Sequence, residues 1–237
     1  MDSLKNILSD IRIFLYGGLR TLPLTLAGTL LVLGLFTANY AILFFLIGFL
    51  VLTPLLAILL NGAIGSILEY YQIAAFKTKT ADICRVILPY TTLQNPVGVR
   101  EENIVFSTWM AMVAFFAGYL FTNGLELHNR EAPSGKDAPT VDMEAKVSAR
   151  KTQALVAMGS VLFFALLVIG FRLYSGCENV YTILLTSLTF LYAGHGWYRL
   201  LASVGEDRLS DLFGIANRLL AASATQSGPI ACIPIRV

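Results

Sequence analysis

The sequence predicts an all-α, polytopic membrane protein with about five transmembrane helices and an amphipathic helix near each end. The first observation behind this prediction is that no charged residue occurs between Arg20 and Glu69. As one helix that stretch would be roughly 70 Å long, whereas the hydrocarbon core of a bilayer is about 30 Å thick. The second observation is that hydrophobic residues make up 56% of the 237 residues and charged residues only 14%, against about a quarter charged in soluble domains. We therefore expect residues 1–237 to form a single membrane domain.

The first predicted element is an amphipathic helix over residues 3–16. Ser3 can cap its start, and the pair Gly17-Gly18 should end it. We expect this helix to lie in the membrane interface, and docking to a partner protein is the alternative role. Its apolar residues recur at helical spacing: Leu4, Ile7, Leu8, Ile11 and Leu15.

The uncharged stretch is long enough for two spans, which are predicted over residues 22–38 and 40–60. The segment Thr37–Tyr40 is the only plausible turn, because it lies near the middle and holds small and polar residues. Pro54 should kink the second span, and its apolar period continues to about Tyr71. A re-entrant hairpin remains the alternative to two full crossings.

Three further apolar runs predict spans over residues 104–122, 154–173 and 180–200. The last two should form a tight antiparallel hairpin, because only the short polar link Tyr174–Asn179 separates them. A second amphipathic helix is predicted over residues 206–221, where the apolar residues form one stripe.

Two polar segments connect these spans, over residues 72–103 and 124–151. They hold most of the extramembrane polar surface, so we expect residues 72–102 and 124–151 to contact partner proteins. Five spans place the two termini on opposite sides of the membrane. Eight Lys and Arg residues then lie on the side of the N-terminus and nine on the other side, so the positive-inside rule predicts no orientation.

The three cysteines are Cys84, Cys177 and Cys232, and they form no CxxC or metal-binding spacing. We expect three free thiols. A disulfide between Cys84 and Cys177 stays open, because the five-span topology places both on the same side.

No catalytic, cofactor-binding or metal-binding residue is predicted, and we expect that the chain is not an enzyme. The sequence contains no HExxH, no Gly-rich phosphate loop, no GxSxG and no Cys/His cluster. A lipid-phosphatase pattern fails because Lys136 and Gly205 stand where its two histidines should be. The chain has two histidines, His128 and His195. A proton-transfer pair would need both within about 3 Å, directly or through one water.

His195 and Arg199 lie four residues apart and share one face of the predicted fifth span. Ionisable residues within a span would indicate an ion or proton pathway. The adjacent Trp197 and Tyr198 are typical of the membrane interface, which favours a merely hydrogen-bonded His195 at headgroup level. The net charge of +2 is too small to indicate nucleic acid as a partner.

Three segments carry a resemblance to a known group of proteins, namely Ser9–Pro23, Phe115–Asn123 and Gly194–Leu220. Through them, over most of its length, the chain resembles integral virion membrane and minor capsid-associated proteins of nucleocytoplasmic large DNA viruses, the chlorovirus-like group. The resemblance includes no catalytic motif and supplies no functional residues. It implies a protein of the virion inner membrane, and of host membranes during assembly, that ties the bilayer to the capsid.

The favoured function is therefore structural, with the lipid bilayer and neighbouring capsid or membrane-complex proteins as partners. One alternative is a small channel or transporter that uses the face of His195 and Arg199. Another is an accessory subunit of a large membrane complex. A continuous polar cavity through the helices would favour the channel.

Overall fold

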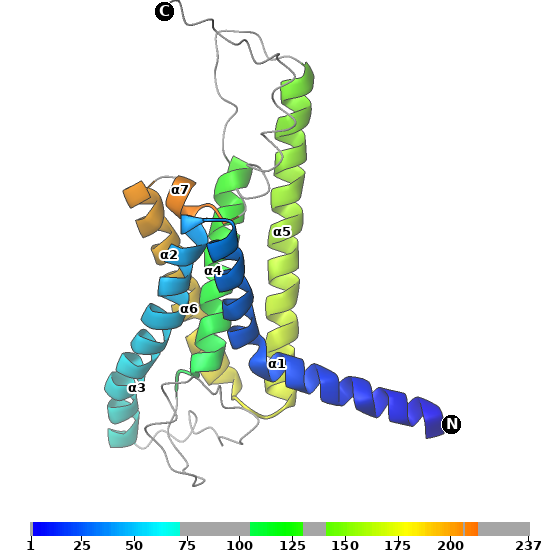
Figure 1. Cartoon of the computed structure of the whole chain (residues 1–237). Helices are drawn as coiled ribbons and strands as arrows, with labels where there is room; N and C mark the ends of the chain where they lie inside the picture. Colours follow the sequence, from blue (N-terminus) through cyan, green and yellow to red (C-terminus); the bar gives the residue numbers. More distant parts are fainter. Residues whose placement is uncertain (1, 72–104, 130–140, 206, 213–237) are drawn as a thin grey trace, which may run out of the picture.

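The computed structural model describes residues 2–71, 105–129, 141–205 and 207–212 (Figure 1). Every regular element in these ranges is a helix, which confirms the all-α class for this part of the chain. A π-helical turn, η1 (Gly48–Leu52), joins α2 to α3. The α-helices are α1 (Asp2–Phe36), α2 (Tyr40–Ile47), α3 (Thr53–Tyr70), α4 (Thr108–Asn129), α5 (Val141–Tyr174), α6 (Val180–Gly205) and α7 (Asp207–Ser210).

Three helical stretches are long and apolar enough to cross a membrane: Tyr40–Ile67, Thr108–Asn129 and Val147–Tyr174. Thr21–Phe36, within α1, is also apolar but shorter. Helix α6 is not among the three although it has 26 residues, and polar side chains interrupt its apolar surface. The described helices thus support a membrane protein with three candidate spans rather than the expected five.

Helix α4 forms the centre of the bundle (Figure 1). It contacts α6 and α5 most extensively, and also α3, η1 and α1. In the most apolar stretch of α4, 72% of the residues are buried, whereas in that of α5 only 17% are buried. Helix α5 therefore packs along one side of the bundle and leaves most of its surface to the surroundings.

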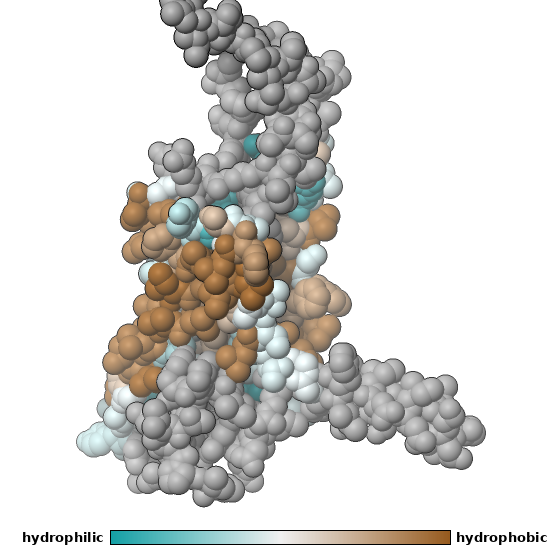
Figure 2. Space-filling view, viewed as in Figure 1, coloured by the Kyte–Doolittle hydropathy of each residue, from teal (hydrophilic) through white to brown (hydrophobic). Residues whose placement is uncertain are grey.

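Apolar side chains cover the middle of the molecule on the face drawn in Figure 2. A contiguous apolar surface of this size is a liability in water but is what a bilayer requires. On α5 alone the exposed large hydrophobic residues include Leu155, Val156, Leu162, Phe163, Phe164, Leu166, Leu167, Leu173 and Tyr174. The exposed apolar surface is thus the physical basis for placing this protein in a membrane.

The bundle has two ends, which carry different connections (Figure 1). We call one the link end, because the Ser175–Asn179 link between α5 and α6 lies there together with the start of α4. We call the other the cap end, because α7 lies there and packs against α2 and α6. The Thr37–Asn39 turn between α1 and α2 is also at the cap end.

The turn between the first two predicted spans lies where the sequence predicts it. Helix α1 ends at Phe36 and α2 begins at Tyr40. Ala38 has a positive φ of 49°, and the Asn39 side chain accepts a hydrogen bond from the Ala41 N–H at 2.9 Å. Asn39 is thus the N-cap of α2, a position that favours Asn.

The helix just before Pro54 contains a π-helical turn. The π-helical turn Gly48–Leu52 precedes Thr53, whose hydroxyl and backbone N–H both donate to the carbonyl of Gly48. A π-turn inserts one extra residue into the helix, and such turns are a known cause of helix bending. The expected effect of Pro54 on the second span thus takes the form of a π-turn just before the proline.

The sequence predicts that the first helix ends at Gly17-Gly18, but helix α1 continues past these residues. It continues to Phe36 and includes Pro23, and Figure 1 shows its first part leaving the bundle sideways at the link end. Two glycines cost a helix only about 1 kcal/mol each, and an unbroken helix keeps backbone groups hydrogen-bonded at a membrane surface. The glycines and the proline therefore bend this helix rather than stop it.

The expected polar loop over residues 124–151 is largely helical. Helix α4 extends to Asn129, and α5 begins at Val141, so only residues 130–140 fall outside the described helices. Packing explains the extension, because Gly124 of α4 lies directly against Met158 and Ala154 of α5. At its other end α4 begins at Thr108, after the expected start of the third span at residue 104.

The expected amphipathic helix over residues 206–221 is shorter in the described part of the chain. Helix α7 ends at Ser210, and Asp211 and Leu212 are not helical. The Ser210 carbonyl accepts a hydrogen bond from the Tyr119 hydroxyl at 2.8 Å, so a tertiary contact uses the group that would continue the helix. Residues 213–221 of this prediction lie outside the described residues.

Candidate functional site

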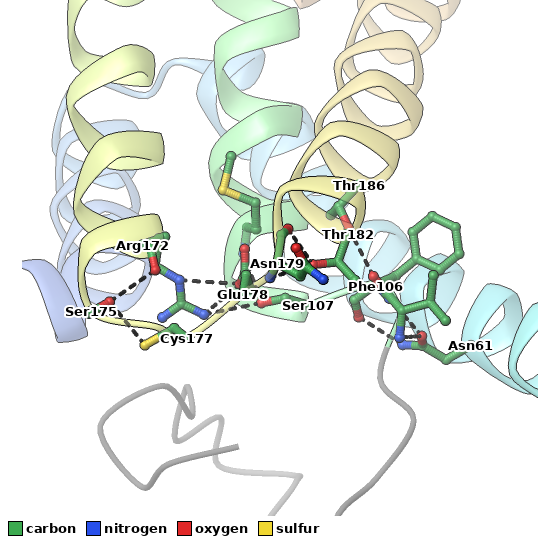
Figure 3. Close-up of polar contacts among 12 residues, drawn as sticks. Asn61, Phe106, Ser107, Arg172, Ser175, Cys177, Glu178, Asn179, Thr182 and Thr186 are labelled. Atoms are coloured by element: carbon green, nitrogen blue, oxygen red, sulfur yellow. Dashed lines mark hydrogen bonds and ion pairs between the residues drawn. The ribbon is translucent and has the colours of Figure 1, made fainter. Parts of the chain in front are cut away.

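Two clusters of polar side chains lie at opposite ends of the bundle, and they are the candidate functional sites. The link-end cluster centres on Arg172 and Glu178 (Figure 3). The cap-end cluster centres on Asn123 and Asp211. The sequence predicts neither pair, and Arg172 falls within the predicted span over residues 154–173.

Arg172 and Glu178 form a buried ion pair at the link end. Nη2 of Arg172 lies 2.6 Å from Oε1 of Glu178, Nε donates to the same oxygen at 3.2 Å, and each side chain is only 4% exposed. The guanidinium also stacks over the Trp109 ring at 4.7 Å from its centroid. Arg172 further donates to Ser107 at 3.4 Å, so one side chain ties α5 to the start of α4 and to the link.

The link geometry brings the two charges together. Gly176, with a positive φ of 67°, follows α5 as a left-handed cap residue. Its N–H donates to Leu173 at 3.1 Å, and the Cys177 N–H donates to Arg172 at 3.2 Å, which is the pattern of a Schellman motif. This turn reverses the chain and places Glu178 beside Arg172, six positions earlier in the sequence. Arg172 in the last turn of α5 also suits the negative end of the helix dipole.

The other carboxylate oxygen of Glu178 is a distinctive atom of this cluster. Oε2 is buried and makes no hydrogen bond within the part of the chain that the structure describes. An unpartnered oxygen on a buried carboxylate is costly, so the ion pair with Arg172 is the interaction that keeps this charge in place.

Asn61 forms a second polar contact at the link end, with the residues just before α4 (Figure 3). Its Oδ1 accepts hydrogen bonds from the backbone N–H groups of Val105 at 3.1 Å and Phe106 at 2.8 Å. Its Nδ2 donates to the Phe106 carbonyl at 2.7 Å, and Thr186 of α6 donates to the Val105 carbonyl at 3.2 Å. These bonds satisfy backbone groups that have no helical partner. The sequence does not identify Asn61 as a contact residue, and its one available signal is an Asn within an apolar run.

The cap-end cluster attaches α7 to the bundle. Nδ2 of Asn123 donates to the Asp211 carboxylate at 3.1 Å, and the Tyr119 hydroxyl donates to the Ser210 carbonyl. Asn123 and Asp211 are both buried, and the Tyr119 ring packs edge-on against Tyr198 with centroids 5.3 Å apart. The segment after α6 is therefore anchored by side chains that come from the middle of α4.

His195 and Arg199 do share one face of α6, as the sequence predicts, and both contact α4. His195 Nδ1 lies 3.1 Å from the Thr122 hydroxyl, and Arg199 pairs with Glu126 at 2.9 Å. The Arg199 side chain is 60% exposed, so this ion pair contributes little to stability. The arrangement agrees with a hydrogen-bonded His195 rather than a histidine that faces a second ionisable group.

The two histidines bond to different neighbours. His128 Nδ1 lies 3.3 Å from the Asn129 side chain, while His195 contacts Thr122. Within the described residues no group of three His, Cys, Asp or Glu side chains could hold a metal ion. Lys136, which stands where the lipid-phosphatase pattern has a histidine, lies outside the described residues.

An aromatic core separates the two polar clusters. Tyr119 and Phe45 pack edge-on with centroids 4.9 Å apart, Phe45 stacks on Phe49 at 5.5 Å, and Phe106 packs against Phe190 at 6.2 Å. All five side chains are fully buried. The space between the two ends of the bundle is thus filled by rings over this region.

The backbones of α4 and α6 touch directly through two glycines. A Cβ added to Gly194 would lie 2.9 Å from the Tyr119 nitrogen and still closer to the Phe115 carbonyl. A Cβ added to Gly118 would lie 2.8 Å from the Leu191 Cα. Small residues that allow backbones to approach are characteristic of helix packing in membranes, and at this crossing they leave no room for a water-filled path.

No protein family, characterised protein or solved structure matches this chain.

Proposed function

We propose that this chain is a structural integral membrane protein that crosses the bilayer five times and ties a virion inner membrane to the surrounding protein shell. The observation that supports a structural role is the direct backbone contact between α4 and α6, with aromatic rings filling the interior beside it. A rigid, filled bundle suits an anchor. The virion assignment itself follows from the resemblance carried by Ser9–Pro23, Phe115–Asn123 and Gly194–Leu220.

We propose five crossings because each of five helical segments can be placed between the link end and the cap end (Figure 1). They are the second half of α1, the continuous unit α2–α3, and helices α4, α5 and α6. Helix α6, with 26 residues, is about 39 Å long at 1.5 Å per residue and can cross the ~30 Å core despite its polar residues. Its polar side chains His195 and Arg199 pair with Thr122 and Glu126 of α4.

The number of spans predicts where the termini lie. Epitope tags at the N-terminus and at the C-terminus should differ in protease accessibility in sealed vesicles, because an odd number of crossings separates them. Equal protection of the two tags would require an even number of spans and would refute the five-span proposal. Detergent-solubilised protein, in which both tags should be cleaved, is the control.

Incorporation into the assembled particle is the test of the structural role. Helix α4 ends at Asn129 and α5 begins at Val141, so a deletion of residues 131–139 removes no residue of either helix. We expect this deletion to leave membrane insertion intact and to reduce incorporation into particles severalfold, because exposed connections are where recognition concentrates. Replacement of the same nine residues by Gly and Ser is the matched control for connection length, and it should also reduce incorporation. Normal incorporation of both variants would exclude residues 131–139 as a partner contact.

A channel is the second candidate, because His195 and Arg199 are ionisable side chains that contact α4 and stay partly exposed. The filled core argues against it, so we expect purified protein in liposomes to conduct no protons or cations above the rate of protein-free liposomes. A flux that disappears in His195→Ala would establish the channel. Co-purification of the native protein with redox subunits would instead favour an accessory subunit of a membrane complex.

A further inference from the structure

Cys177 carries information about the orientation of this protein in the membrane. It lies in the Ser175–Asn179 link, is 3% exposed, and its sulfur is disulfide-bonded. The Ser175 hydroxyl lies 3.2 Å from the same sulfur. The expectation of three free thiols is therefore wrong, since at most one cysteine of the three can remain free.

The position of Cys177 is fixed by its neighbours rather than by its sulfur partner. Arg172 and Glu178 flank it in a buried ion pair, and Arg172 also reaches Ser107 before α4. These contacts place Cys177 at the link end whichever cysteine supplies the second sulfur. Cys84 and Cys232 both lie outside the described residues. Cys84 follows α3 in the sequence, and α3 ends at the link end, so we expect Cys84 to be the partner.

We propose that the link end of the bundle faces an oxidising compartment and that the cap end faces the reducing, cytosolic side. Disulfides persist in the lumen of the secretory pathway and outside the cell, and are rare in the cytosol. The count of Lys and Arg residues divides almost evenly between the two sides and predicts no orientation. The disulfide therefore indicates an orientation in the membrane, which the charge distribution does not.

This orientation separates the two polar segments expected to contact partners. Cytosolic partners would reach the connection between α4 and α5 and the region of α7. Partners in the oxidising compartment would reach the connection between α3 and α4 and the Ser175–Asn179 link. The orientation does not depend on the virion assignment, because it rests on Cys177 and on the arrangement of the helices.

Glycosylation mapping of the full chain in the endoplasmic reticulum of cultured cells tests the proposal, because N-glycans are added only in the lumen. The substitution P89N creates an acceptor site Asn-Tyr-Thr between α3 and α4. The double substitution S134N/K136T creates Asn-Gly-Thr between α4 and α5. We expect one glycan, removable by endoglycosidase, on P89N and none on S134N/K136T.

A glycan on S134N/K136T would overturn the proposed orientation. The oxidation state of Cys177 in the same cells is an independent measurement. Before reduction, maleimide should modify only one of the three cysteines, and after reduction it should modify all three. In Cys177→Ser the released partner should become reactive, which identifies it as Cys84 or Cys232 by peptide mass. A Cys177 thiol that reacts with maleimide before reduction would also overturn the proposal. If neither acceptor site is glycosylated, the oxidation state of Cys177 is the deciding measurement.

Discussion

Gly194→Ala should destabilise this protein strongly, by about 3 kcal/mol, at the upper end of the cost of overpacking a core. The added Cβ would meet the backbone of Phe115 and Tyr119 on α4. Backbone atoms cannot move aside as a flexible side chain can, so α4 and α6 would have to separate. Separation would also disturb the Tyr119–Tyr198 ring contact and the bond between His195 and Thr122. The measurement is the midpoint of thermal unfolding of the purified protein in detergent micelles.

Gly196→Ala is the matched control for this substitution. Gly196 lies two residues further along α6, and a Cβ added there has no atom within 4 Å. Alanine is favoured over glycine in a helix by up to about 1 kcal/mol, so the midpoint of Gly196→Ala should stay unchanged or rise slightly. Equal midpoints for the two variants would show that α4 and α6 do not touch as described.

Glu178→Leu should destabilise the protein by about 3–5 kcal/mol, the usual cost of removing one partner of a buried ion pair. The variant would leave the Arg172 guanidinium buried without the Glu178 carboxylate, although its contacts with the Trp109 ring and the Ser107 hydroxyl would remain. Arg172→Met should cost a similar amount, because it would leave a carboxylate with neither oxygen paired to a cation. Thermal unfolding in detergent and the yield of monodisperse protein are the measurements.

The double variant Arg172→Met/Glu178→Leu distinguishes an ion pair from general packing. Replacing both charges by apolar side chains removes the unpaired charge, so the double variant should be markedly more stable than either single variant. Additive losses would contradict the coupling. The exposed pair of Arg199 and Glu126 is the control, since Arg199→Ala should change stability by less than about 1 kcal/mol.

Local features of the sequence were sufficient for the positions of several elements. Asn39 and the small residues before it mark the turn between α1 and α2, because an Asn N-cap and a break in the helix need only neighbouring residues. The short link with Gly176 likewise predicts the hairpin of α5 and α6. Helix ends were predicted less well. Helix α1 continues through Gly17-Gly18, and α5 begins at Val141, inside the expected polar loop.

The polar clusters could not be predicted from the sequence, because their members are brought together by tertiary contacts. Asn61 and Phe106 lie 45 positions apart, and Asn123 and Asp211 lie 88 positions apart. Glu178 is closer to Arg172 in sequence, but only the reversal at Gly176 and the burial of both side chains distinguish the pair from two surface charges. Neither type of contact leaves a periodic pattern along the chain.

The sequence by itself determined the helical class and the apolar character of this protein, because hydrophobicity and helical period act over neighbouring residues and are set by the solvent around the chain. The tertiary structure decided which side chains hold the helices together. The contact between Gly194 and α4, the ion pair in the link and the attachment of α7 each depend on distances between segments far apart in the chain. Those distances are set by close packing of the whole bundle, since packed interiors tolerate neither voids nor overlaps.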